Sequence, residues 1–115
     1  MIQNHLTSQP LSKRLKELKV PQVSEFYWQE CADSTNNWSF GKTTTNYGLP
    51  VENYYSAFLS SELFEKYLGK ENIYIYYNGG KVNATGIETS ITAENLPEAL
   101  GLYLEYLILN GLIKL

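Results

Sequence analysis

The stretch NIYIYYNGGKVNATG, residues Asn72–Gly86, decides the fold class of this chain. Ile73 and Ile75 alternate with Tyr74 and Tyr76, which is the period of a strand that places one face on a core. An Asn-Gly pair then supplies the positive-φ positions of a type I′ turn, and the alternation resumes after it. The stretch therefore predicts an antiparallel hairpin with its isoleucines inside and these two tyrosines outside.

A helix is predicted downstream of the hairpin, after a return strand that we expect to continue to Ile91. The sequence NLPE at residues 95–98 is typical of a capping box, with Asn95 as the cap and Glu98 at the third helical position. The helix should run to about Leu109. Its wide apolar arc predicts that most of its surface is buried.

The acidic residues Glu94, Glu98 and Glu105 line up along this helix. Two carboxylates one turn apart could hold a hard metal ion, but such a site needs more convergent ligands than the scattered acids offer. We therefore expect a solvated stripe here.

Upstream of the hairpin, Leu11, Leu15 and Leu18 repeat at the spacing of one helical face, and Pro21 follows as a stop signal. The remaining pattern predicts strands at 24–30 and 38–45, a third strand or an irregular segment at 51–58, and a short helix at 61–68.

This order of elements predicts one α+β domain over residues 1–115, with residues 1–7 as a flexible N-terminal tail. We expect an antiparallel sheet of four to five strands with two or three helices packed on one face.

Composition excludes some classes of function. The net charge of -3 and the pI of 5.1 argue against a protein held by bulk phosphate attraction. Cys31 is the single cysteine, so no disulfide forms within the chain. The first residues lack the order of a signal peptide, and no apolar run is long enough for a membrane span. We expect a cytoplasmic protein, in a host cell if it is phage-encoded, without contact with a membrane.

No catalytic constellation is evident. Residues 36–43 resemble a phosphate-binding loop, but Asn36 occupies the position of its first glycine and no helix is predicted to follow. His5 has no predicted partner for acid–base work with Cys31. We therefore expect a protein that is not an enzyme and that has no cofactor or metal.

Aromatic residues are the unusual feature of the composition, with ten tyrosines in the chain. We expect the outward-facing aromatic residues to form one open sheet face, made of Tyr74, Tyr76, Trp28, Trp38, Tyr54 and Tyr55. Such a face can anchor a protein partner or stack the bases of a single strand. Because stacking proteins usually add a basic groove, a protein partner is favoured over nucleic acid. Cross-strand aromatic pairs can also stabilise a sheet without any ligand.

A basic cluster on the first helix is a second candidate site, formed by Lys13, Arg14, Lys16 and Lys19. It could face phosphate groups. The alternative is the solvated side of an amphipathic helix, which Glu17 dilutes.

Two terminal motifs carry a resemblance. The opening LKELKVPQVSEFYW at residues 15–28 and the ending NLPEAL at residues 95–100, with Asn110-Gly111-Leu112 after it, resemble small uncharacterised phage- or prophage-associated α+β proteins of bacteria. The resemblance covers about a third of the chain. It implies a phage or prophage setting and transfers no catalytic residue.

The leading hypothesis is a non-enzymatic protein-interaction module of phage or prophage origin. It would bind through its tyrosine-rich face and self-associate through apolar surface of the last helix. Two alternatives are a phage-encoded inhibitor of a host defence enzyme and a binder of single-stranded nucleic acid that stacks bases on Tyr74 and Tyr76.

Overall fold

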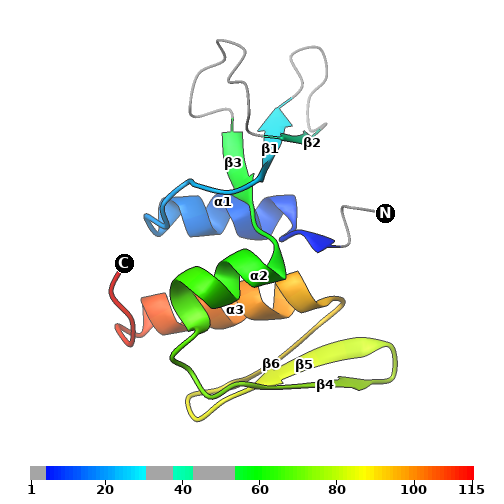
Figure 1. Cartoon of the computed structure of the whole chain (residues 1–115), viewed down its shortest axis with the longest axis vertical. Coiled ribbons are helices and arrows are strands. Elements are labelled where there is room, and N and C mark those ends of the chain that lie inside the picture. The colour runs from blue at the N-terminus through cyan, green and yellow to red at the C-terminus, as the bar shows by residue number, and fades with distance from the viewer. Residues whose placement is uncertain (1–4, 31–37, 43–53) are drawn as a thin grey trace.

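The computed structural model describes residues 5–30, 38–42 and 54–115, and it gives the backbone alone for residues 29, 30, 38–42 and 54. The fold is α+β, as expected (Figure 1). The elements follow the order α1 (Gln9–Glu17), β1 (Phe26–Glu30), β2 (Trp38–Lys42), β3 (Tyr54–Ala57), α2 (Ser60–Leu63), η3 (Phe64–Leu68), β4 (Tyr74–Asn78), β5 (Lys81–Thr85), β6 (Ser90–Ala93) and α3 (Leu96–Leu109). The element η3 is a wider helical turn that continues α2 without a break.

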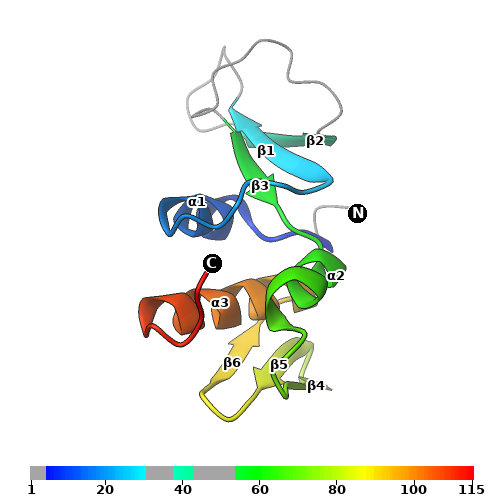
Figure 2. The same ribbon diagram turned by 60° about the vertical axis from the view of Figure 1, so that its left-hand side comes forward.

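The described strands form two antiparallel sheets in place of the one sheet expected. One sheet has the order β2-β1-β3 and the other the order β4-β5-β6. Figures 1 and 2 show the two sheets at opposite ends of the molecule, with the helices between them. The helical layer thus has a sheet on each side, which a two-layer arrangement would not provide.

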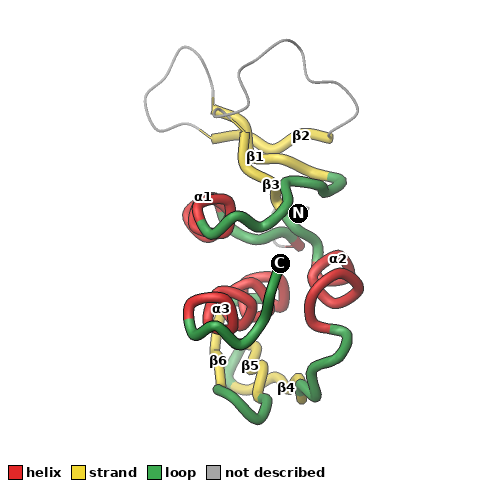
Figure 3. Tube along the Cα trace, turned by 90° about the vertical axis from the view of Figure 1, so that its left-hand side faces the viewer, coloured by secondary structure: helices red, strands yellow, loops and turns green. Residues whose placement is uncertain are grey.

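The helix α3 lies in the middle of the molecule and explains this arrangement. It packs on α1, α2, β5 and β6, and the view in Figure 3 shows it between α1 and the β4-β5-β6 sheet. Its buried side chains include Leu100, Tyr103, Leu104 and Leu107, each no more than 1% exposed. A helix that is apolar around most of its circumference must be covered on several sides, so the prediction that α3 is largely buried is confirmed.

The return strand of the hairpin ends at Thr85, so the expected continuation to Ile91 is wrong. The Gly86 N–H donates to the Thr89 carbonyl at 2.9 Å, and the chain reverses into β6. Gly86 lies against the phenol of Tyr103, and a Cβ at this position would overlap it. The close approach of the turn to a buried ring is the reason that glycine fits here.

The N-terminal segment is packed into the core, so the flexible tail predicted for residues 1–7 is wrong at Leu6 and Thr7. Their side chains are 1% and 0% exposed. The backbone N–H of Thr7 donates to the Phe58 carbonyl at 2.9 Å, and its hydroxyl accepts from the Phe58 N–H at 3.0 Å. The Thr7 carbonyl also accepts from the indole N–H of Trp28 at 2.8 Å. Residues 1–4 of the predicted tail lie outside the described residues.

The two long helices end in the same hydrogen-bond motif. After α1, the Lys19 N–H donates to the Lys16 carbonyl at 3.0 Å and the Val20 N–H donates to the Leu15 carbonyl at 3.1 Å. This is a Schellman motif, which needs a left-handed residue just past the helix. Lys19 occupies that position in α1 with a φ of 71°, whereas Gly111 occupies it in α3 with a φ of 66°. The lysine adopts a conformation that glycine adopts at lower cost.

Candidate binding surface

The β4–β5 hairpin positions the candidate surface. Its tip is Gly79-Gly80, with φ values of 60° and 79°, and Asn78 pairs with Lys81 across it. The turn is a two-residue loop with both central residues at positive φ, which matches the right-handed twist of the strands. The prediction of such a turn is confirmed, but the two glycines occupy its centre in place of the Asn-Gly pair.

The alternation along β4 is as expected from the sequence. Tyr74 and Tyr76 are 74% and 50% exposed, while Ile73 and Ile75 pack against the core. Tyr77 lies on the same side as Ile75 but is 72% exposed, whereas its partner Val82 on β5 is 4% exposed. The inner side of the sheet is thus covered at β5 and open at the edge strand β4. The two isoleucines hold the strand on the core and thereby direct the two tyrosines to solvent.

Polar side chains continue this outer surface across β5 and β6. Tyr74 is opposite Thr85 and Tyr76 is opposite Asn83, and these in turn are opposite Ser90 and Thr92. We call the surface formed by these six residues the outer face. Its pattern was present in the sequence, since the polar residues Asn83 and Thr85 alternate with the buried Val82 and Ala84, but it was overlooked there.

Hydrogen bonds within the outer face fix its polar groups. The Asn83 amide Nδ2 donates to Ser90 Oγ at 3.2 Å and to Thr92 Oγ1 at 2.9 Å. The Thr85 hydroxyl donates to Asn83 Oδ1 and lies 2.9 Å from the Ser90 hydroxyl. This network holds Asn83 in one orientation beside Tyr76, so the polar half of the face is fixed by contacts within the chain.

One ion pair lies at the end of the outer face nearest the hairpin tip. Lys81 Nζ lies 2.9 Å from Glu94 Oε1, and both side chains are more than half exposed. None of the six residues of the outer face carries a charge. An uncharged surface of tyrosine, amide and hydroxyl groups is therefore what the β4-β5-β6 sheet presents to solvent.

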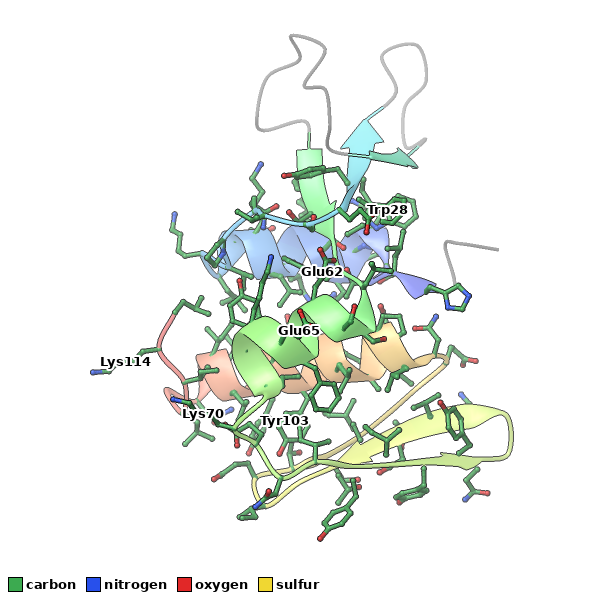
Figure 4. All side chains as sticks on the ribbon, in the orientation of Figure 1. Trp28, Glu62, Glu65, Lys70, Tyr103 and Lys114 are labelled. Atoms are coloured by element: carbon green, nitrogen blue, oxygen red, sulfur yellow. The ribbon has the colours of Figure 1, made fainter. Side chains whose placement is uncertain are left out.

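The other predicted aromatic residues belong to the opposite sheet, so the single aromatic face expected from the sequence is wrong. Trp28 and Tyr55 are cross-strand partners on β1 and β3, and Figure 4 shows Trp28 at the upper sheet, far from β4. Both are partly buried, and the Tyr55 ring lies 5.2 Å from Lys16 Nζ. Trp38 and Tyr54 are in β2 and β3 of the same sheet, but their side chains lie outside the description.

The basic cluster predicted on α1 is divided among separate contacts. Arg14 Nε donates to Glu105 Oε2 at 2.7 Å, and this ion pair raises the pKa of the Arg14 guanidinium. Lys16 lies over the Tyr55 ring. The side chains of Lys13 and Lys19 are exposed. Two of the four cations thus have a partner within the chain, which leaves less charge for phosphate groups than the sequence suggested.

The carboxylates of α3 bind α1, so the solvated stripe expected at Glu98 and Glu105 is wrong. The Ser8 N–H donates to Glu98 Oε1 at 2.8 Å, and the Ser8 hydroxyl donates to Oε2 at 2.7 Å. Between the two acids, a Cβ at Gly101 would lie 2.6 Å from Leu11 Cδ2, so the helices approach closely. The polar stripe of α3 is therefore its interface with α1.

The expected cap of α3 is confirmed in part. Asn95 Oδ1 accepts from the Glu98 N–H at 3.0 Å, but the Glu98 carboxylate reaches Ser8 and does not complete the capping box. Within the described part of the chain, no three His, Cys, Asp or Glu side chains gather as metal ligands would.

The apolar surface that α3 leaves open for self-association lies near its C-terminal end. The apolar arc of α3 is covered by its own molecule, and the exposed apolar residues remaining near its end are Leu109, Leu112 and Leu115, at 65%, 46% and 50% exposure.

No model of a known protein family, no curated protein and no solved structure matches this chain. None of the helices in the described ranges is both long and apolar enough to cross a membrane.

Proposed function

We propose that this chain is a non-enzymatic protein-binding module whose recognition surface is the outer face. The observation that carries the proposal is the placement of Tyr74 and Tyr76, which are 74% and 50% exposed on the strand β4. A tyrosine offers a large apolar ring and a polar tip at a small cost in side-chain entropy, which is why tyrosine is enriched in interfaces.

The polar half of the outer face supports a protein partner. Asn83 and the three hydroxyl residues beside it can donate and accept hydrogen bonds at the rim of a contact, and charged groups, which are depleted from the centres of interfaces, are absent from these positions. The network also limits the loss of side-chain freedom on binding.

Nucleic acid is the weaker candidate because the outer face offers little for phosphate groups. Lys81 is the cation beside it, and Glu94 is paired with that lysine at 2.9 Å. Proteins that stack bases combine aromatic rings with a positively charged groove. Inhibition of a defence enzyme by occupying its basic nucleic-acid channel would need an acidic face, and the outer face itself has no acid. The phage or prophage setting that the terminal motifs suggest stays a prediction.

A comparison of three baits tests the proposal. Wild-type chain, the double variant Tyr74→Ser/Tyr76→Ser and the control Tyr77→Ser are used to capture proteins from a bacterial lysate, followed by quantitative mass spectrometry. Tyr77 is a matched control because it is 72% exposed on the same strand but lies on the other side of the sheet.

We expect a partner that the wild type and the control retain and the double variant loses, with all three melting at similar temperatures. A set of captured proteins that is the same for the three baits would overturn the proposal. Quenching of tyrosine fluorescence by single-stranded oligonucleotides at low salt, lost in the double variant, would favour the nucleic-acid alternative instead.

A further inference from the structure

Among the described strands, β4 pairs with β5 alone, and the hydrogen-bonding groups of its other edge can be assigned from the hairpin. Asn78 and Lys81 flank a two-residue turn, so they form a hydrogen-bonded pair. Hydrogen-bonded and non-hydrogen-bonded pairs alternate along an antiparallel ladder. Tyr74, Tyr76 and Asn78 therefore direct their N–H and C=O groups toward β5. The corresponding groups of Ile75 and Tyr77 point away from β5, toward the open edge of the sheet.

The edges at β3 and β6 are protected, whereas no described strand pairs with this edge of β4. At β3, the Gln22 side chain covers the edge, since its Oε1 accepts from the Ser56 N–H at 2.7 Å. β6 has only four residues, and Glu88 and Glu94 flank it. Natural edge strands are commonly protected by charge, proline, a bulge or a cover. β4 has five residues without a charge or a proline, and it pairs with β5 in unbroken register.

We propose that a second copy of this chain pairs with β4 along this edge, so that the β4-β5-β6 sheets of the two copies become one continuous sheet. In an antiparallel, two-fold symmetric pair centred on Tyr76, the whole of β4 overlaps its counterpart. Ile75 then lies opposite the partner's Tyr77, and both residues carry outward-facing N–H and C=O groups, as a hydrogen-bonded pair requires. Tyr76 lies opposite the partner's Tyr76 as the closer, non-hydrogen-bonded pair.

The side chains agree with this register on both sides of the sheet. On the outer side, two Tyr76 rings meet at the symmetry axis, and aromatic pairs at such positions stabilise a sheet. On the inner side, the 72% exposed ring of Tyr77 comes beside the partner's Ile75, which is already packed on its own core. The contact thus covers an apolar ring that a single copy leaves open.

Charge favours β4 over the opposite edge as the site of pairing. Glu71 precedes β4 and Lys81 follows it, so antiparallel pairing brings the acid of one copy to the end where the partner's lysine lies. The same operation on β6 would bring Glu94 toward the partner's Glu88, and these like charges would repel. A second copy is therefore the occupant that fits β4.

The dimer is expected to be weak, because pairing along one short strand buries less than the roughly 1,200 Å² of a standard interface. The inference goes beyond the proposed function and does not require the outer face to bind anything, although pairing would join two outer faces into one.

Sedimentation velocity on the purified chain tests the inference, over concentrations from about 1 µM to about 1 mM where weak interfaces associate. Wild type is compared with Tyr77→Pro, Tyr76→Lys, Tyr74→Lys and Leu109→Ser. The proline removes an outward-facing N–H and no hydrogen bond to β5. The lysine at residue 76 opposes an identical lysine at the axis, whereas a lysine at residue 74 lies opposite the partner's Asn78.

We expect wild type to approach twice its mass of 13.1 kDa as concentration rises, and Leu109→Ser to behave in the same way. Tyr77→Pro and Tyr76→Lys should each weaken dimerisation at least about tenfold, from lost hydrogen bonds and from like-charge repulsion. High salt should restore part of the dimer in Tyr76→Lys, and Tyr74→Lys should change it less. If Tyr77→Pro does not fold, Tyr76→Lys and its salt response decide.

Wild type that stays monomeric at the highest concentration would overturn the inference. So would a dimer that is unaffected by both β4 substitutions, or a dimer that Leu109→Ser abolishes, since the contact would then lie at the end of α3. A monomer that instead binds an extended peptide along β4 would also overturn it.

Discussion

Replacing Glu98 by alanine is expected to be among the most damaging single changes to the α1–α3 interface. The Glu98 carboxylate accepts two hydrogen bonds from Ser8, from the backbone N–H at 2.8 Å and from the hydroxyl at 2.7 Å. Hydrogen bonds to a charged group contribute about 1.5–3 kcal/mol each when partly buried. The negative charge also lies at the N-terminus of α1, which adds about 0.3–1 kcal/mol.

Because water can replace part of these interactions, we expect Glu98→Ala to lower the free energy of unfolding by about 2–4 kcal/mol. That is a large fraction of the roughly 5–15 kcal/mol that a domain of this size has. Glu94→Ala is the control, because Glu94 makes an exposed ion pair with Lys81 and such pairs contribute only about 0–1 kcal/mol. Urea unfolding monitored by circular dichroism measures both.

A double-mutant cycle with Ser8→Ala separates the contact from general effects of removing a charge. We expect a coupling energy of about 1 kcal/mol or more between Ser8 and Glu98, as residues that share hydrogen bonds usually show. The reasoning would be refuted if Glu98→Ala cost no more than Glu94→Ala, or if Ser8→Ala and Glu98→Ala were simply additive.

Three further substitutions test other parts of the fold. Lys19→Gly should stabilise the protein by about 1 kcal/mol. Glycine removes the strain of the left-handed conformation after α1, and this gain exceeds the loss of stability that comes from the greater entropy of glycine in the unfolded chain. A lower midpoint of urea unfolding would contradict this. Gly86→Ala should cost about 1–3 kcal/mol, since its Cβ would overlap the buried phenol of Tyr103; an unchanged thermal midpoint would show that the turn relaxes freely. Burial raises the pKa of that phenol above the value near 10 in the unfolded chain, so the unfolded state loses its proton first and stability falls as the pH rises above about 10. Unfolding free energies of wild type and Tyr103→Phe, measured between neutral and alkaline pH, should show the shallower decline in the variant, and identical slopes would count against this assignment.

The local structure around the hairpin could be read from the sequence because local signals specify it. The alternation of Ile73 and Ile75 with the tyrosines, and a turn that needs positive φ, leave few other conformations. The cap at Asn95 and the burial of α3 were predictable for the same reason. Each depends on residues that are close together in the chain.

The features that were predicted incorrectly depend on contacts between distant segments. A polar stripe on a helix has the same sequence pattern whether water or the polar side of another helix covers it. The stripe alone therefore does not show which of the two it faces. In this chain Ser8 and Arg14 of the N-terminal segment bind Glu98 and Glu105 from about ninety residues away. The wide apolar arc of α3 was the available signal, because a helix buried nearly all round needs cover on more than one side.

The candidate site also combines a local feature that the sequence predicts with a long-range feature that it does not predict. The exposure of Tyr74 and Tyr76 follows from the period of one strand, whereas the grouping of Trp28 and Tyr55 with them required knowing which strands share a sheet. The chain places those two residues on the other sheet, where Trp28 binds the Thr7 carbonyl at 2.8 Å. Strand period thus predicts which side a residue faces, and it does not predict which sheet the strand joins.

Nitration of tyrosines, followed by mass spectrometry of the free chain and of the captured complex, tests most directly whether the outer face is the recognition surface. In the free chain Tyr74 and Tyr76 should react readily while Tyr103, which is 1% exposed, stays unmodified. In the complex, the reactivity of Tyr74 and Tyr76 should fall. Unchanged reactivity of both tyrosines in a stable complex would contradict the proposal, because the partner would then be bound elsewhere.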